Sequence, residues 1–132
     1  MNLINWIKLK NILEKKTYNE FIRNDFNINR YKIHKFLLKQ KNILLQNYVN
    51  DKYLKSKYYN LVQNSFPYNL EKNILHLVLW INKDVIINVE EIIKLELKKI
   101  NKENHIFLFF ENPKHFRSIK KIKHFQVFVK LY

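Results

Sequence analysis

The chain has 132 residues, of which 47% are apolar and 15% aromatic, and it contains neither glycine nor cysteine. This composition predicts one folded domain with a hydrophobic core and excludes an intrinsically disordered chain. The lack of cysteine excludes disulfides and thiolate metal sites. No apolar run approaches the ~20 residues of a membrane span, and residues 1–10 lack a secretory signal pattern. We therefore expect an intracellular protein, in the cytoplasm or nucleus, that is not secreted and has no membrane partner.

The formal net charge is +14, which favours a polyanionic partner such as nucleic acid or a nucleotide. The abundance of Lys, Asn, Ile, Phe and Tyr, however, is also typical of AT-rich codons, so genome bias alone explains much of the lysine. Phosphate sites tend to use arginine, because its guanidinium binds phosphate in a bidentate manner. The net positive charge is therefore explained equally well by a phosphate-binding surface or by sequence drift in an AT-rich genome. The chain has only three arginines, namely Arg23, Arg30 and Arg117.

Residues 1–63 are predicted to form a helical part with about four helices. The first carries an apolar face from Leu3 to Leu13, and a capping-box pattern at 17–20 opens a short second helix. A third helix is expected to begin at Asn29, and a fourth at Asp51 that continues to Val62. The third helix is expected to turn its apolar residues inward, namely Ile33, Phe36, Leu37, Ile43 and Leu44.

Residues 64–132 are predicted to form a β-α-β-β part that carries the site. Strands are expected at 73–81, 105–111 and 124–131, with a helix from 88 to about 100. The 73–81 run is apolar on both of its alternating faces, which is typical of a strand covered on both sides. The whole chain, 1–132, is thus predicted to be a single α+β domain, with its N-terminal helices packed on a small mixed sheet of about three strands.

Strand order brings several polar residues to one edge of this sheet. A helical crossover makes strands 73–81 and 105–111 parallel, so Trp80 and Asn112 lie toward the same edge. An antiparallel last strand then starts with His124 beside Asn112, and the basic 113–123 connection passes over that edge. Ligands favour the carboxyl ends of parallel strands, so we expect a site there, with His76 deeper on the same face as Trp80.

Structural roles are open for each of these residues. A histidine inside a strand, such as His76, is often a buried hydrogen-bonding group, and Trp80 on an apolar strand is commonly core. Asn112 followed by proline is also a common sequence in turns that have no binding role. A zinc site from His76, His124 and Glu111 would have no recognisable ligand spacing, so we predict no metal, and no cofactor is indicated.

The chemistry that fits these residues best is acid–base catalysis on a phosphate-bearing ligand. His76 and His124 are the acid–base candidates, and Arg117 and Lys120 are candidates for phosphate contacts. Ser118 is a candidate nucleophile next to His124, although the chain lacks the glycines of a nucleophile elbow. Trp80 and Asn112 are candidate ligand-binding residues.

Five segments in this order resemble a known family, the domain-of-unknown-function family 3605, which includes the N-acetylglucosamine-induced protein 1. They are NSFPY at 64–68, HLVLW at 76–80, FFENP at 109–113, SI at 118–119 and HFQV at 124–127. The resemblance spans nearly the whole chain and implies a shared fold and a shared site around these segments, but no reaction. Ser65 and Gln126 depart from the pattern, which commonly has Asp and a second His there, so a mechanism that needs either residue is in doubt.

The sequence therefore favours binding, with hydrolysis as an extension, of a nucleotide or nucleic acid at a His/Asn/Ser site. Whether the protein is an enzyme is left open; the activity to test is that of a phosphate-ester hydrolase or phosphodiesterase. Two alternatives stand beside this hypothesis. One is a non-enzymatic interaction or structural module, and the other is a nucleic-acid binder that uses only its charge.

Overall fold

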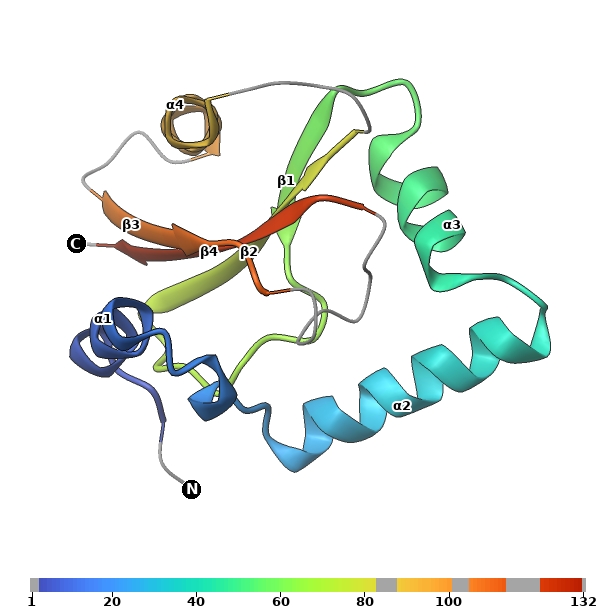
Figure 1. The fold of residues 1–132 in the computed structure, drawn as a ribbon, viewed down its shortest axis with the longest axis horizontal. Coiled ribbons are helices and arrows are strands. Elements are labelled where there is room, and N and C mark those ends of the chain that lie inside the picture. Colours follow the sequence, from blue (N-terminus) through green and yellow to red (C-terminus); the bar gives the residue numbers. More distant parts are fainter. Residues whose placement is uncertain (1–2, 83–87, 101–104, 114–121, 132) are drawn as a thin grey trace.

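The computed structural model describes residues 3–82, 88–100, 105–113 and 122–131, and shows a four-stranded sheet with helices on both faces (Figure 1). This confirms the α+β class. Besides a 3₁₀ turn at Tyr18–Glu20 and a π-helical turn at Asn50–Leu54, the elements are α1 (Trp6–Lys15), α2 (Asp25–Gln40), α3 (Leu45–Val49), β1 (Tyr59–Gln63), β2 (Ile74–Ile81), α4 (Val89–Ile100), β3 (His105–Phe110) and β4 (His124–Leu131).

The sheet has the order β1-β2-β4-β3, and every neighbouring pair is antiparallel. β2 and β3 run in the same direction, as a helical crossover predicts, but β4 lies between them. The sheet therefore differs from the predicted mixed one in its pairing and in having a fourth strand. The insertion of β4 sets Trp80 opposite His124, and it sets Phe110 opposite Gln126.

The β2 strand is buried on both faces, as its sequence predicts. On one face, Leu77 and Leu79 pack with Val127 of β4 against Ile93 and Leu97 of α4. Helix α4 is amphipathic, with Glu90 and Glu91 in its first turn and Lys98 and Lys99 in its last, an arrangement that its dipole favours. This face is therefore an ordinary sheet–helix core.

The opposite face of the sheet is covered in two separate places (Figure 1). At one end, Leu9 and Ile12 of α1 pack with Phe128 of β4. At the other end, Val49 of α3 and Leu54 of the π-helical turn pack on Val78 and Trp80 of β2. The polar residues His76, Gln126 and His124 belong to this same face, between or beside the two apolar clusters.

The prediction of a fourth helix up to Val62 was wrong, because β1 begins at Tyr59. The helical turn from Asn50 stops at Leu54, and Ser56 then takes a left-handed conformation with φ of 61°. Tyr59 to Gln63 pair with the exposed edge of β2. Pairing with an open strand edge supplies hydrogen-bond partners for a whole segment, which outweighs a weak helical pattern.

Helix α2 begins at Asp25, with Asn24 as its cap, rather than at Asn29, and its predicted inward face was wrong. Ile33 and Phe36 are each 58% exposed, and Leu38 is the one residue of the helix that is buried. The helix spans the gap between the α1 end and the α3 end of the sheet face, so most of it packs on no apolar layer (Figure 1). The residues that contradict the prediction are Ile33, Phe36, Leu37, Ile43 and Leu44, all exposed.

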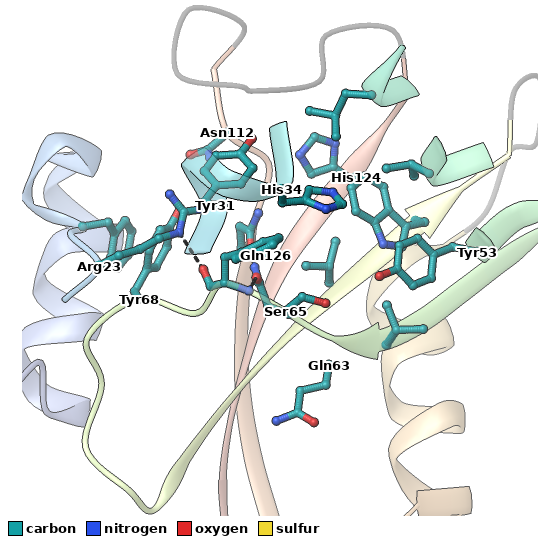
Figure 2. Close-up of a pocket in the computed structure, with 18 of the residues that line it drawn as sticks. Arg23, Tyr31, His34, Tyr53, Gln63, Ser65, Tyr68, Asn112, His124 and Gln126 are labelled. Atoms are coloured by element: carbon teal, nitrogen blue, oxygen red, sulfur yellow. Dashed lines mark hydrogen bonds between the residues drawn. The ribbon is translucent and has the colours of Figure 1, made fainter. Parts of the chain in front are cut away.

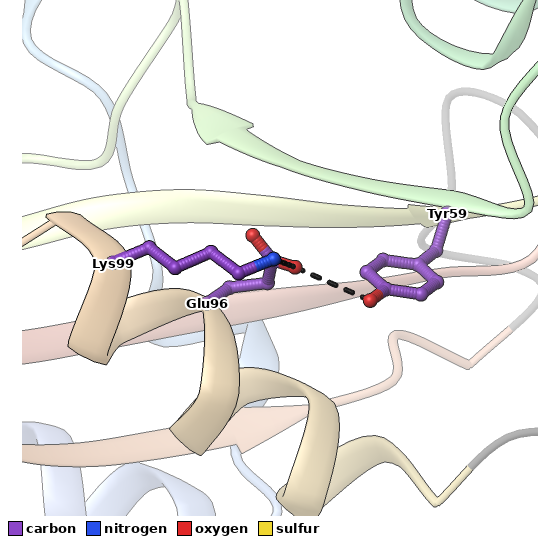
Figure 3. Close-up of polar contacts among 3 residues, drawn as sticks. All are labelled: Tyr59, Glu96 and Lys99. Atoms are coloured by element: carbon purple, nitrogen blue, oxygen red, sulfur yellow. Dashed lines mark hydrogen bonds and ion pairs between the residues drawn. The ribbon is translucent and has the colours of Figure 1, made fainter.

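A polar contact joins the edge strand β1 to α4 on the first face (Figure 3). The Tyr59 hydroxyl donates to Glu96 Oε1 at 3.2 Å, and Lys99 Nζ lies 3.2 Å from the same oxygen. Burial, reinforced by the Glu96 contact, raises the pKa of Tyr59. Replacing Tyr59 by Phe is expected to lower the free energy of unfolding by only about 1 kcal/mol, since one partly exposed neutral–charged hydrogen bond is lost. Urea denaturation measures this, and a loss several times larger would show that the contact holds β1 in place.

Candidate functional site

A pocket of about 460 Å³ lies between the second face of the sheet, α2, α3 and residues 64–68 (Figure 2). Its size is within the range of small-molecule sites. The described lining contains three Lys or Arg side chains and no Asp or Glu. The cationic residues are Arg23, Arg30 and Lys52, and Tyr31, Tyr53, Phe66, Tyr68 and Trp80 are among the aromatic ones.

Residues 64–68, here called the 64–68 turn, follow β1 in the chain and form part of the pocket lining before the chain reaches β2. Asn64 Oδ1 accepts from the Phe66 backbone N–H at 2.8 Å, a local bond typical of asparagine turns. The Tyr68 backbone N–H donates to His76 Nδ1 at 3.1 Å. The backbone of this turn is thus fixed against the buried strand β2.

The 64–68 turn holds two arginines by consecutive carbonyl groups. Arg23 Nε donates to the Phe66 carbonyl at 2.6 Å, and Arg30 Nη1 donates to the Ser65 carbonyl at 3.1 Å. The Arg23 guanidinium also lies over the rings of Tyr31 and Tyr68, at 5.0 and 5.4 Å. Within the described residues neither arginine has a carboxylate partner. Two oriented guanidinium groups therefore face a pocket whose described lining has no compensating negative charge.

Sequence reasoning missed these arginines, although their rarity was a usable signal. Two of the three arginines in the chain line this one pocket. The predicted partners of phosphate, Arg117 and Lys120, and the candidate nucleophile Ser118 lie outside the described residues. The sequence argument attributed much of the lysine content to genome bias. The positions of the arginines, by contrast, indicate where a phosphate group would bind.

An aromatic group forms another part of the pocket wall. The rings of Tyr53 and Trp80 are stacked, with centroids 5.8 Å apart and planes 9° apart, and His124 lies 4.8 Å from Trp80. The indole Nε1–H of Trp80 is buried and has no hydrogen-bond acceptor among the described residues. Trp80 is thus both core and pocket wall, which combines the two roles considered from the sequence.

His124 begins β4 opposite Trp80 and lines the pocket. Its Nδ1 lies 2.9 Å from the Ile122 carbonyl oxygen, so Nδ1 carries the proton and donates it. In the neutral ring the lone pair is then on Nε2. This tautomer is the one needed for a base or acceptor that acts through Nε2.

His76 is 4% exposed and lies behind the pocket wall. Because Nδ1 accepts from Tyr68, the ring proton is on Nε2, which donates to Gln126 Oε1 at 2.6 Å. Burial lowers the pKa of His76 to about 3, and the Gln126 hydrogen bond opposes this only in part. Both nitrogens are engaged and the ring is neutral near pH 7, so the geometry favours a positioning role over the acid–base role expected from the sequence.

Asn112 is buried at the end of β3 and lines the pocket together with Trp80, as strand order predicts. Its side chain hydrogen-bonds the Tyr68 hydroxyl, a contact that lowers the pKa of Tyr68, while burial raises it by more. Asn112 thereby connects the end of β3 to the 64–68 turn. Figure 2 shows Asn112, Tyr68 and Arg23 on one side of the pocket and His124 and Tyr53 on the other.

His34 of α2 also lines the pocket, where it contacts Tyr48 and Phe66 edge-on or tilted. Burial lowers the pKa of His34, and the nearby Lys52 ammonium lowers it further. Lys52 Nζ donates to the Tyr48 hydroxyl at 2.9 Å, and this hydrogen bond is the main cause of its raised pKa. At neutral pH this part of the wall therefore has a neutral imidazole and a charged lysine.

A metal-binding cluster and a membrane-spanning helix are both absent from the described part of the chain. Within it, no group of three His, Asp or Glu side chains is arranged to hold a metal ion. The helices of this part also include none with the length and apolar character of a bilayer span.

Comparison with known proteins agrees with the resemblance seen in the sequence. The family model described as "Protein of unknown function (DUF3605)" matches residues 5–130, nearly the whole chain. A search of curated proteins gives no significant match. Among solved structures, the crystal structure of a protein called HTC1 is similar, with a TM-score of 0.69 and 21% sequence identity, over 97% of this chain and 85% of that chain. At this identity the likeness shows a shared fold.

Proposed function

This chain belongs to the DUF3605 family of proteins of unknown function, and we propose that it binds a phosphate-bearing ligand, a nucleotide or nucleic acid, in the pocket between the sheet and α2. The observation that carries the proposal is the pair of arginines held by the Ser65 and Phe66 carbonyls. Each guanidinium has further N–H donors, and the described pocket lining has no carboxylate to neutralise them.

The electrostatics of the pocket support an anionic ligand over a neutral or cationic one. Lys52 adds a third positive charge, and its raised pKa keeps it protonated at neutral pH. Guanidinium groups bind phosphate oxygens in a bidentate manner and are pre-oriented here by backbone carbonyls and aromatic rings. Arg117 and Lys120, from the sequence, remain proposed additional phosphate contacts.

A catalytic extension of this proposal depends on His124. Hydrolysis of a bound phosphate ester needs a group that transfers a proton at the reacting atoms. His124 lines the pocket and has the tautomer that leaves the lone pair on Nε2, whereas His76 lies behind the wall. Release of inorganic phosphate from a nucleoside monophosphate, compared between the wild type and His124→Gln, tests the extension. A turnover that the substitution leaves unchanged would exclude His124 as the catalytic group.

Binding itself is tested with single-charge variants on the two sides of the sheet. The ligands are a nucleoside monophosphate, ribose 5-phosphate and a short single-stranded oligonucleotide, with affinities measured by isothermal titration calorimetry at several salt concentrations. Arg30→Ala is expected to weaken binding by about tenfold to a hundredfold, because a charged hydrogen bond to phosphate is lost. Lys98→Ala, which removes the same charge from the exposed surface of α4, is the matched control and is expected to have little effect.

Two results would count against the proposal. If none of the three ligands binds to the wild type, the pocket is not a phosphate site. If Arg30→Ala and Lys98→Ala weaken binding equally, and affinity falls steeply with salt in both, the protein binds through its overall charge and not through the pocket. Melting temperatures of both variants establish that each is folded.

A further inference from the structure

The pocket offers different chemistry at its two ends. Arg23 and Tyr68 lie at one end with Asn112, and Tyr53 and His124 lie at the other (Figure 2). The first end has the guanidinium over two aromatic rings. The second has the aromatic group of Tyr53, Trp80 and His124. A ligand that satisfies both ends has an anionic group separated from a planar, polar ring.

The buried indole N–H of Trp80 favours a ligand with a polar ring at the second end of the pocket. A buried donor with no acceptor costs free energy, so most such groups in native proteins have a partner. Trp80 Nε1 has none among the described residues, although the side chain lines the pocket. Its neighbour Tyr53 is half-buried and belongs to the π-helical turn, a type of turn that often occurs at functional sites. The nitrogen is fully covered in this structure, so a ligand acceptor reaches the N–H only when a neighbouring side chain, such as the stacked Tyr53 ring, moves.

Gln126 presents a second donor group to the same ligand. Its Oε1 accepts from His76 Nε2 at 2.6 Å and from Asn64 Nδ2 at 3.1 Å. These two bonds fix the carboxamide orientation, and Gln126 lines the pocket, so its Nε2 amide is the group left to donate to a ligand. An indole N–H and an amide NH₂ together suit a ring edge rich in acceptors, as on a nucleobase. They offer less to a sugar, whose hydroxyls both donate and accept in any orientation.

The walls of the pocket also favour one nucleotide over a polymer. The lining comes from the sheet, from α2, from α3 with the π-helical turn, and from the 64–68 turn, so the site has walls from four directions. Proteins that hold single strands instead use an open groove that follows the backbone, with aromatic side chains on which successive bases stack. Here the Trp80 ring is already flanked by Tyr53 and His124.

Resting on the proposed function, we infer that the ligand is a nucleoside monophosphate, with its phosphate at Arg23 and Arg30 and its base at the Trp80 end. Trp80 and Gln126 then recognise the base, and His76 acts through Gln126 as a positioning residue. The inference adds a base-recognition subsite to the phosphate site.

The test compares ligands that share the phosphate and differ in the base. Trp80 is one of only two tryptophans, so the Trp6→Phe variant reports on the pocket through the fluorescence of Trp80 alone. Each of the four ribonucleoside monophosphates, ribose 5-phosphate and a short single-stranded oligonucleotide is titrated into this variant. At least one nucleoside monophosphate is expected to bind about tenfold tighter than ribose 5-phosphate, because a base contact of ordinary strength gives this ratio.

Substitutions at the base end should remove that preference and leave the phosphate affinity intact. Trp80→Phe, followed by calorimetry, is expected to lower the affinity for the nucleotide to that for ribose 5-phosphate, since the indole N–H is lost while a smaller aromatic ring is kept. Trp80 is buried, so a second variant is made at a half-buried position: Tyr53→Leu removes an aromatic ring from the same end of the pocket and is expected to give the same result.

The outcomes separate the two claims. Equal affinity of ribose 5-phosphate and every nucleoside monophosphate would overturn the base subsite and leave the phosphate site standing. An oligonucleotide that binds much tighter than any mononucleotide would overturn it in favour of a polymer. No binding of any phosphate-bearing ligand would overturn the proposed function and the inference together.

Discussion

Replacing His76 by Ala is expected to lower the free energy of unfolding by about 3 kcal/mol, because two buried polar groups lose their partner. The Tyr68 backbone N–H loses its acceptor, and Gln126 Oε1 loses the shorter of its two donors. The ring also fills space against Phe128 and Tyr68, at centroid distances of 4.8 and 4.6 Å. Urea denaturation at pH 7 measures the change.

The conservative variant His76→Asn serves as the control for this prediction. The asparagine oxygen takes the place of Nδ1 and accepts from the Tyr68 N–H, whereas the donor to Gln126 is lost. We expect it to recover roughly 1 kcal/mol of the loss, the typical net value of one hydrogen bond. A loss below about 1 kcal/mol for His76→Ala would contradict the role of His76 as the group that fixes the 64–68 turn.

Acid should destabilise the protein through the same residue. The pKa of His76 falls from its ordinary 6.5 to about 3 on folding, chiefly because burial disfavours the charged ring, with a smaller effect of the Arg23 charge. Between these two values the unfolded chain binds a proton at His76 that the folded chain does not. The effect of His76 on the free energy of unfolding is therefore absent above pH 6.5. As the pH falls from 6.5 toward 3, protonation of His76 in the unfolded chain lowers the free energy of unfolding by roughly 1.4 kcal/mol per pH unit.

The pH effect is isolated by comparing the wild type with His76→Asn from pH 7 to pH 4. The lowered pKa of His34 gives a slope of the same sign in both proteins, so it cancels in the difference. The wild type is expected to lose stability more steeply than the variant below pH 6.5. Parallel curves for the two proteins would show that His76 takes up a proton as readily in the folded chain as in the unfolded chain, in conflict with its lowered pKa.

The elements of the second half, though not their pairing, could be predicted from the sequence because their signals are local. β2 is apolar on both faces, and α4 has a clear amphipathic period with charges that suit its dipole. The first half was less predictable. β1 forms because β2 offers an open edge, and α2 stays exposed because it spans the gap between two apolar clusters. Neither cause can be recognised from the spacing of apolar residues along the chain.

The candidate site could likewise be predicted only in part from the sequence. Trp80 and Asn112 lie toward one edge of the sheet, as the common direction of β2 and β3 predicts, and His124 lines the same pocket although β4 lies between these two strands. Arg23 and Arg30 were missed because they reach the pocket through carbonyls 43 and 35 residues away in the chain. Contacts of this kind depend on tertiary packing and have no fixed spacing that a sequence pattern could show.

The measurement that tests the central claim most directly is a crystal structure of the wild type grown with a saturating nucleoside monophosphate. We expect a phosphate group within hydrogen-bond distance of the Arg23 and Arg30 guanidinium groups, in the pocket between the sheet and α2. A nucleotide bound elsewhere on the surface, with this pocket empty or filled by its own side chains, would contradict the account.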